Sequence, residues 1–287
     1  MKLGLVYVLL LIPFLAPAQN NYKVFNTTTQ KLATLDDIAK EMANADVLFY
    51  GEEHNDSVGH TLELALFTKL IEKYPGKATL SLEMFETDTQ PVLNEYLNGL
   101  IREKNMISDA RAWPNYTDYR PMVELAKQQH IPVIAANSPG RYTNRVTRLG
   151  LNSLNDLSST AKTWLPPLPV DTATGAYAKK FAALMGGHGM PGMQVYQSQN
   201  LWDATMAWSI TKHLKAHAGC KIMQINGGFH SEDKLGAVEK LKKYAPTARI
   251  INVAAYAIDN IETVDWSKYN KANNYIIVTD IKLQKSF

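Results

Sequence analysis

The sequence predicts an α/β fold with a mainly parallel central sheet flanked by helices. Two observations lead to this prediction. Short runs rich in β-branched residues alternate with longer stretches that have helical periodicity. Most of the short runs also lack a strict alternation of apolar and polar residues, which is typical of strands that are buried on both faces of a sheet.

Expected strands and helices alternate along most of the chain. The strands are expected at residues 47–50, 79–83, 132–136, 221–225, 249–253 and 275–280. The helices are expected at residues 62–74, 90–100, 122–129, 196–214 and 234–244. No convincing crossover helix precedes the last strand, so we expect that strand to form an antiparallel edge of the sheet.

Residues from about 138 to 193 interrupt this alternation. The prolines of the segment Trp164–Pro169 exclude a continuous helix there. Farther along, the segment Met185–Met193 is rich in glycine and methionine and contains His188. We expect a helical insertion over the carboxyl end of the sheet, with this segment as a lid or as a disordered loop.

The first residues have the pattern of a secretory signal peptide. Lys2 is followed by the apolar run Leu3–Ala16, and Ala16 and Ala18 form an A-x-A cleavage pattern. The alternative is a retained anchor, but the run is shorter than the roughly 20 residues that span a bilayer. We expect cleavage near Ala18, a single mature domain at residues 19–287, and a secreted or periplasmic location.

Cysteine content and charge exclude several classes of protein. Cys220 is the only cysteine, so the chain has neither an intramolecular disulfide framework nor the lipid-attachment cysteine of a bacterial lipoprotein. The net charge is +3, and the basic residues are dispersed among acidic ones. A nucleic-acid partner is therefore not expected.

Two short motifs of the same form follow predicted strands. Gly51-Glu52-Glu53-His54 and Gly227-Gly228-Phe229-His230 each have a glycine, two residues and a histidine. Glu83 and Asn137 stand at the ends of two further predicted strands. If these strands are parallel, all of these side chains lie at one edge of the sheet, where ligands bind in open α/β folds.

Two imidazoles and one carboxylate are suited to a divalent cation, or to a general base with an orienting acid. We therefore predict a site formed by His54, Glu83 and His230, in which these residues hold a metal ion or act in catalysis together with Glu52. The alternative is that each of them makes only structural hydrogen bonds.

A helix expected from residue 194 to about residue 217 carries further polar groups. Gln199 and Asp203 are four residues apart and lie on one helix face, so they are expected to point toward the strand-end site. Structural hydrogen bonds are again the alternative. His213 and His217 lie near the end of this helix and are expected at the surface.

These residues together resemble a known family. The segments that carry the likeness are Gly51–Asn55, Leu82–Phe85, Ile131–Pro139 with Arg141, Gln199–Ala207 and Gly227–His230. In this order, across about residues 46–235, the chain is similar to the ChaN-like haem-binding proteins of the Tiki superfamily. The resemblance implies a bacterial extracytoplasmic protein associated with haem and iron uptake, and some members bind haem between two protomers.

The superfamily also contains Tiki metal-dependent proteases and resembles erythromycin esterase-type hydrolases. By motif, the likeness implies that Glu52, His54, Glu83 and His230 are the catalytic or metal-binding residues. Their implied neighbours are Asn137, Arg141, Gln199 and Asp203. No motif identifies the iron ligand of a haem, for which the candidates are His188, Tyr116, Tyr119 and Tyr142.

Three hypotheses follow. The first is an extracytoplasmic haem-binding protein that forms a homodimer and works with outer-membrane or periplasmic uptake components. The second is a metal-dependent hydrolase of the peptidase or esterase type, with Glu52 or Glu53 as the proton-transfer base. The third is a binding domain in which the strand-end cluster serves only the structure.

Overall fold

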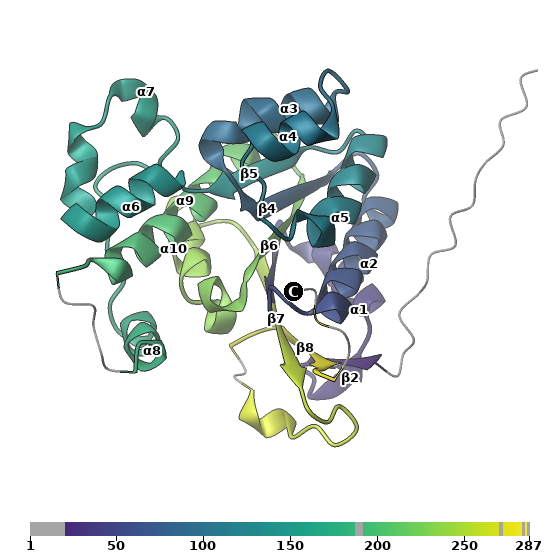
Figure 1. Ribbon diagram of the computed structural model, residues 1–287. Helices are drawn as coiled ribbons and strands as arrows, with labels where there is room; N and C mark the ends of the chain where they lie inside the picture. Colours follow the sequence, from purple (N-terminus) through teal and green to yellow (C-terminus); the bar gives the residue numbers. More distant parts are fainter. Residues whose placement is uncertain (1–20, 187–191, 270–271, 283–284, 286–287) are drawn as a thin grey trace, which may run out of the picture.

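The computed structural model describes residues 21–186, 192–269, 272–282 and 285. In this part of the chain an eight-stranded sheet has the order β2-β1-β8-β7-β3-β6-β4-β5 (Figure 1). The strands are β1 (Tyr22–Asn26), β2 (Lys31–Ala33), β3 (Val47–Glu52), β4 (Ala78–Glu86), β5 (Val133–Asn137), β6 (Lys221–Gly227), β7 (Ile250–Ile258) and β8 (Tyr275–Asp280).

Six neighbouring strands of this sheet, from β8 to β5, run parallel, which confirms the predicted α/β class. The expectation of an antiparallel edge at the last strand is wrong. β8 is parallel to β7 and lies inside the sheet, because β1 pairs antiparallel with its other side. The connection at residues 259–274 is long enough for a parallel crossover, although its described residues contain only a short 3-10 turn, Trp266–Lys268.

Ten α-helices are described around the sheet. They are α1 (Leu35–Glu41), α2 (Ser57–Lys73), α3 (Gln90–Leu97), α4 (Glu103–Asp109), α5 (Tyr116–Gln128), α6 (Gly140–Leu149), α7 (Ser159–Lys162), α8 (Ala176–Leu184), α9 (Val195–Ala216) and α10 (Ala237–Tyr244). In Figure 1, α1, α2 and α5 lie on one side of the sheet, and α6, α9 and α10 lie on the other.

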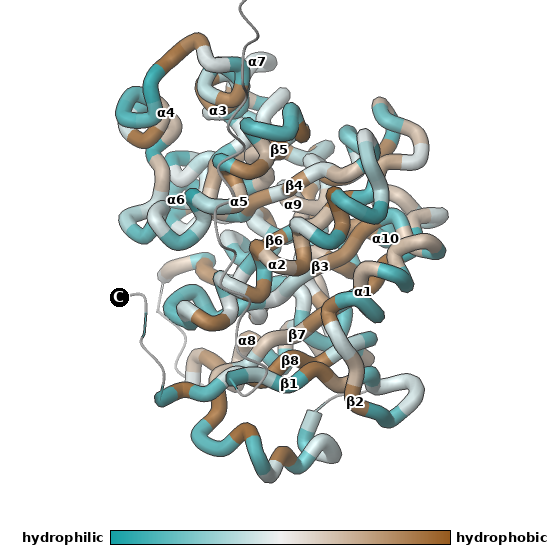
Figure 2. Tube along the Cα trace, turned by 90° about the vertical axis from the view of Figure 1, so that its right-hand side faces the viewer, coloured by the Kyte–Doolittle hydropathy of each residue, from teal (hydrophilic) through white to brown (hydrophobic). Residues whose placement is uncertain are grey.

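Each face of the sheet has its own hydrophobic core, because side chains alternate along a strand. Leu48 and Tyr50 of β3 pack among residues of α1, α2 and α5. Val47 and Phe49 of the same strand pack among residues of α9 and α10. Figure 2 shows hydrophobic stretches along the strands and hydrophilic ones on many of the surrounding turns.

The region from residue 138 to 193 contains α6, α7 and α8, as the predicted helical insertion requires. Lys180 of α8 forms an ion pair of 2.7 Å with Glu232, just beyond the end of β6, so α8 lies beside the carboxyl end of the sheet. His188 lies outside the described residues, and so does the predicted signal peptide at residues 1–18. Among the described helices, none combines the length and apolar character needed to cross a membrane.

Candidate functional site

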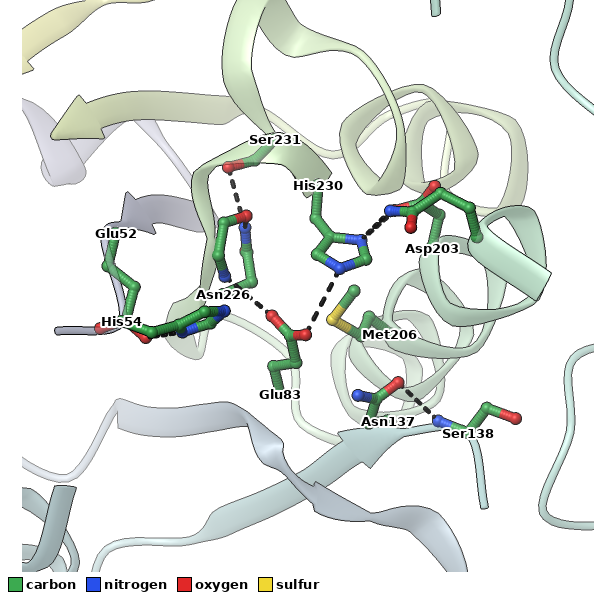
Figure 3. A network of polar contacts seen from close by, with 12 residues as sticks. Glu52, His54, Glu83, Asn137, Ser138, Asp203, Met206, Asn226, His230 and Ser231 are labelled. Atoms are coloured by element: carbon green, nitrogen blue, oxygen red, sulfur yellow. Dashed lines mark hydrogen bonds and ion pairs between the residues drawn. The ribbon is translucent and has the colours of Figure 1, made fainter. Parts of the chain in front are cut away.

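The two glycine-histidine motifs lie side by side at the carboxyl edge of the sheet. β3 and β6 are adjacent parallel strands, and their register pairs Glu52 with Gly227. β4 lies on the other side of β6 and contributes Glu83. Figure 3 shows His54, Glu83 and His230 converging on one region, so the parallel topology brings together residues that are far apart in the sequence.

His54 is oriented by a buried carboxylate. Its Nδ1 lies 2.7 Å from Glu52 Oε1, and the hydroxyl of Tyr119 donates to the same oxygen at 2.7 Å. The side chain of His54 is 37% exposed, whereas that of Glu52 is 1% exposed. Burial lowers the pKa of His54, but the hydrogen bond to Glu52 outweighs burial and leaves the pKa raised. The pair therefore holds a partly exposed imidazole in a fixed orientation.

Gly227 makes room for this imidazole. A Cβ atom added to Gly227 would lie 2.6 Å from Nε2 of His54. The backbone N–H of Gly227 donates to Glu83 Oε2 at 2.8 Å. The glycine of the second motif thus lets the histidine of the first approach the backbone beside Glu83.

His230 is bound by a carboxylate at each ring nitrogen. Nδ1 lies 2.7 Å from Asp203 Oδ1, and Nε2 lies 3.3 Å from Glu83 Oε1. Burial lowers the pKa of His230, but Glu83 and Asp203 outweigh it and raise the pKa to about 10. Burial has the opposite effect on the carboxyl group of Glu83 and raises its pKa, yet the nearby His230 holds that pKa below its usual value. His230 is therefore a buried imidazolium at neutral pH.

The polar face of α9 points at His230, as its spacing predicts. The Gln199 amide nitrogen lies 3.0 Å from His230 Nδ1 and 3.2 Å from the hydroxyl of Tyr177. That hydroxyl donates to Asp203 Oδ2 at 2.5 Å. The sequence analysis did not select Tyr177, because one buried tyrosine of the insertion carries no motif.

Three predicted residues have other partners. The side chain of Asn137 is buried, and its Oδ1 accepts from the backbone of Ser138. Arg141 forms an ion pair of 2.5 Å with Asp88. Glu53 is exposed, and its Oε1 accepts from the backbone N–H of Ala257 at 3.2 Å.

Aromatic rings stand against both histidines. Trp113 meets His54 edge to face at a centroid distance of 5.2 Å. Trp202 meets His230 in the same manner at 6.2 Å. Both tryptophans are partly exposed, so an apolar surface adjoins the accessible imidazole of His54.

Glu52 also belongs to a second group of titratable side chains, together with His60 and Glu63 of α2. Oxygens of Glu52 and Glu63 and a ring nitrogen of His60 all lie within 4.8 Å of one another, and all three residues are buried. Burial lowers the pKa of His60, but both carboxylates outweigh it and raise the pKa to about 11. Burial raises the pKa of Glu63. The sequence analysis missed His60 and Glu63, whose signal was their three-residue spacing in the helix after the first motif.

Among the described residues, this buried group is the one whose donor atoms lie close enough to share an ion. The donor atoms of the predicted trio His54, Glu83 and His230 do not all lie that close to one another, and the role of this trio in metal binding stays a prediction.

A family model described as "Haem-binding uptake, Tiki superfamily, ChaN" matches residues 38–241 of the chain. This match covers most of the chain and all of the strand-end residues described above. The chain belongs to this ChaN family.

Several solved structures are similar to this ChaN family member. One is ChaN of Campylobacter jejuni, described as showing cofacial heme binding, which is 16% identical over 91% of this chain and 98% of that one, with a TM-score of 0.67. Two more distant ones are the type III effector HopBA1 (10% identity, 86% and 93% coverage, TM-score 0.48) and the erythromycin esterase EreC (9% identity, 90% and 83% coverage, TM-score 0.49). Among curated proteins, none matches this chain.

Burial distinguishes among the candidate iron ligands of this ChaN family member. Tyr116 and Tyr119 are buried, and burial raises the pKa of both hydroxyls, which disfavours the tyrosinate that binds iron. Tyr142 is partly exposed beneath the guanidinium of Arg141. His54 joins the candidates, because its Nδ1 is bound to Glu52 and its other nitrogen is not.

Proposed function

We propose that this protein binds haem at the surface around His54. The observation that carries the proposal is the match of residues 38–241 to a family of haem-binding proteins. The site supports it in two ways. An accessible imidazole is held by a buried carboxylate, and Trp113 provides an apolar neighbour for a flat ring system.

The chemistry of His54 fits an iron ligand. Histidine and tyrosine both hold haem iron in proteins, and metal-binding histidines usually bind a carboxylate or carbonyl through the other ring nitrogen. Glu52 occupies that second position on His54 at 2.7 Å. The ligand candidates are thereby His54, the partly exposed Tyr142, and His188, which lies outside the described residues.

Titration of the purified protein with hemin tests the proposal. A saturable and shifted Soret band is expected in the wild type. The variants His54→Ala, Tyr142→Phe and His188→Ala identify the ligand by the one whose band changes, and the exposed His217→Ala serves as a matched control. A titration as featureless as that of an inert protein would overturn haem binding.

Export and uptake are a further part of the proposal. The apolar run before Ala18 supports secretion or a periplasmic location, with a mature chain that begins at Gln19. N-terminal sequencing of protein recovered outside the cytoplasm should return Gln19. Such a location would let the protein work with uptake components. Pairing of two protomers around haem predicts an increase in molar mass on hemin addition, which light scattering can measure.

A second candidate function is a hydrolase. The specific observation in its favour is the Glu52–His54 pair, which resembles a general base with an orienting acid. A divalent ion at His54, Glu83 and His230 would polarise a carbonyl in that mechanism. Assays against ester and peptide panels, with and without added metal, should then show turnover that His54→Ala abolishes; absence of any turnover removes this candidate.

A further inference from the structure

The group formed by Glu52, His60 and Glu63 lies between β3 and α2, behind the haem-binding surface proposed above. Glu52 is the last residue of β3, and His60 and Glu63 lie one turn apart in α2. Their side chains are buried, with 3%, 6% and 0% of each residue exposed. Three groups that prefer water therefore share an interior position, and each needs a partner there.

The protonation of His60 is constrained by its neighbours. Nε2 lies 3.1 Å from the backbone carbonyl oxygen of His54, which can only accept a hydrogen bond. Nε2 therefore carries a proton. Nδ1 then faces Glu52 Oε2 and Glu63 Oε2, each at 3.3 Å.

Without an ion, the two carboxylates raise the pKa of His60 and favour a second proton on Nδ1, but that proton satisfies the arrangement poorly. One N–H can point at one oxygen, and charge-assisted hydrogen bonds of this kind are usually about 2.7 to 2.9 Å long. While both carboxyl groups are ionised, Glu52 Oε2 and Glu63 Oε1 have no hydrogen-bond donor among the described residues. The ion pairs described for these two carboxylates involve histidine, and neither lysine nor arginine.

An unpartnered hydroxyl stands beside the same group. Tyr50 is 0% exposed, and its hydroxyl has no hydrogen-bond partner among the described residues. It lies two residues before Glu52 in β3, so both side chains are on the face that α2 covers. This hydroxyl is thus a further buried polar group on the same face that lacks a partner.

We propose that Glu52, His60 and Glu63 bind a divalent first-row metal ion, with zinc as the best fit. Zinc lies about 2.0 to 2.2 Å from nitrogen and oxygen ligands, so the corners of its tetrahedron are roughly 3.3 to 3.6 Å apart. The two distances of 3.3 Å from His60 Nδ1 match that edge. One ion would satisfy all three ligand atoms at once and leave a fourth position for water.

The surrounding contacts suit such a site. The bond from His60 Nε2 to a backbone carbonyl fixes the tautomer in the way that metal-binding histidines usually require. Glu52 Oε1 accepts a hydrogen bond from Tyr119 and also contacts His54. These two contacts orient the other oxygen, Oε2, toward the group. The ion would therefore also fix the carboxylate that orients His54.

Zinc titration of chelator-treated protein, without haem, tests the proposal. The wild type should take up one equivalent of zinc by elemental analysis and by competition with a chromophoric chelator. His60→Gln and Glu63→Gln should each weaken zinc binding by about 100-fold or more, since each removes a ligand. His217→Ala should keep the wild-type stoichiometry, and so should Glu83→Gln, which alters the predicted His54–Glu83–His230 trio and contacts none of the three proposed ligands.

Several outcomes would overturn the proposal. These are the absence of zinc uptake by the wild type, full uptake by both His60→Gln and Glu63→Gln, or loss of uptake in Glu83→Gln, which would place the ion at the predicted His54–Glu83–His230 trio. Glu63→Gln keeps the shape of the side chain and leaves Glu52 beside His60, so it should fold even if His60→Gln does not. In thermal unfolding, zinc should raise the melting temperature of the wild type and leave that of Glu63→Gln unchanged.

Because the titration contains no haem, its failure would leave the proposed haem site untouched, and failure of the hemin titration would likewise leave the zinc result intact.

Discussion

His230 shows how this protein keeps charge in its interior. An imidazolium with a carboxylate at each nitrogen exchanges its hydration for two directed ion pairs. Such a group gains little net stability, but removal of one partner leaves an uncompensated buried charge. This buried charge lies at the edge of the sheet where the two motifs meet, which is where functional groups collect in α/β folds.

Replacing Asp203 with asparagine should therefore destabilise the fold. Asp203 is 0% exposed and binds both His230 and Tyr177. Loss of its charge should lower the free energy of unfolding by about 3 to 5 kcal/mol, as expected when a buried pair is broken. Urea unfolding measures this change. The exposed Asp259→Asn should shift it by less than about 0.5 kcal/mol, and an equally small effect at Asp203 would contradict the prediction.

His213 should make the fold sensitive to mild acid. The expectation that it lies at the surface is only partly met, because it is half-buried and its Nε2 lies 3.0 Å from the hydroxyl of Thr79. Burial, together with the neighbouring His217, lowers its pKa to about 4. The unfolded chain, with a pKa of about 6.5, binds the proton first, so stability falls as the pH drops from 6.5 toward 4.

The size of this effect should be on the order of 1 kcal/mol after allowance for solvent screening. Urea unfolding at pH 7 and at pH 4.5 measures it, with His213→Gln as the comparison. The variant should lose less stability between the two pH values than the wild type does. Equal losses would show that His213 does not contribute.

At the level of residues, the sequence predicted the members of the site that follow motifs. Glu83, His230, Gln199 and Asp203 are in mutual contact or share a partner, because strand ends and helix spacing determine where they lie. Tyr177, His60 and Glu63 could not be predicted in the same way. The spacing of His60 and Glu63 places them on one helix face, but only the packing of α2 and of the insertion against the sheet brings these residues and Tyr177 to Glu52 and Asp203.

At the level of elements, the adjacency of β3 and β6 creates the site. The two strands pair in parallel, so the loops that follow them leave the sheet at the same edge. Gly227 then lies directly against His54. Its φ of −55° is one that any residue can adopt, so the need for glycine here arises from space and not from backbone conformation.

Gly227→Ala should therefore displace His54 and leave the backbone unstrained. The added methyl group would lie 2.6 Å from Nε2 of His54, which requires the imidazole to move. If His54 binds the iron, hemin affinity should fall by about tenfold or more, equivalent to about 1.4 kcal/mol. Spectroscopic titration measures this change.

Gly219→Ala provides the control for that experiment. Nothing lies within 4 Å of the added methyl group, although the φ of +76° makes the substitution somewhat unfavourable. It should cost about 1 kcal/mol of stability and leave hemin affinity unchanged. Wild-type affinity in Gly227→Ala would exclude His54 as the ligand.

The sequence also predicted six of the described strands and most of the long helices, because their apolar runs are strong and regular. It missed β1 and β2 and misjudged β8. β2 is short and largely exposed, so it has little apolar pattern. The lack of a convincing crossover helix predicted an antiparallel edge at β8, but β8 is parallel to β7 and pairs with β1 on its other side.

At the level of the whole molecule, the sheet extends beyond the family match. The matched region ends at residue 241, yet β7 and β8 continue the same sheet, and β8 pairs with β1 from the other end of the chain. Such pairing is expected if residues 19–287 fold as one unit, as the sequence analysis predicts. The alternative is that the matched region unfolds independently of the strands that follow it.

Ile277→Ala distinguishes these alternatives. Ile277 is 0% exposed in β8, outside the matched region, and pairs with Ala255 on one side and Val24 on the other. Its truncation should cost about 2 to 5 kcal/mol. In a Trp266→Phe background every remaining tryptophan lies within residues 38–241, so tryptophan fluorescence reports on the matched region alone. One cooperative unit requires that the fluorescence and circular dichroism midpoints in urea fall together by the same amount.

Leu32→Ala, 65% exposed in β2, should leave both midpoints nearly unchanged. A fluorescence midpoint that Ile277→Ala does not move would show instead that the matched region folds without β8.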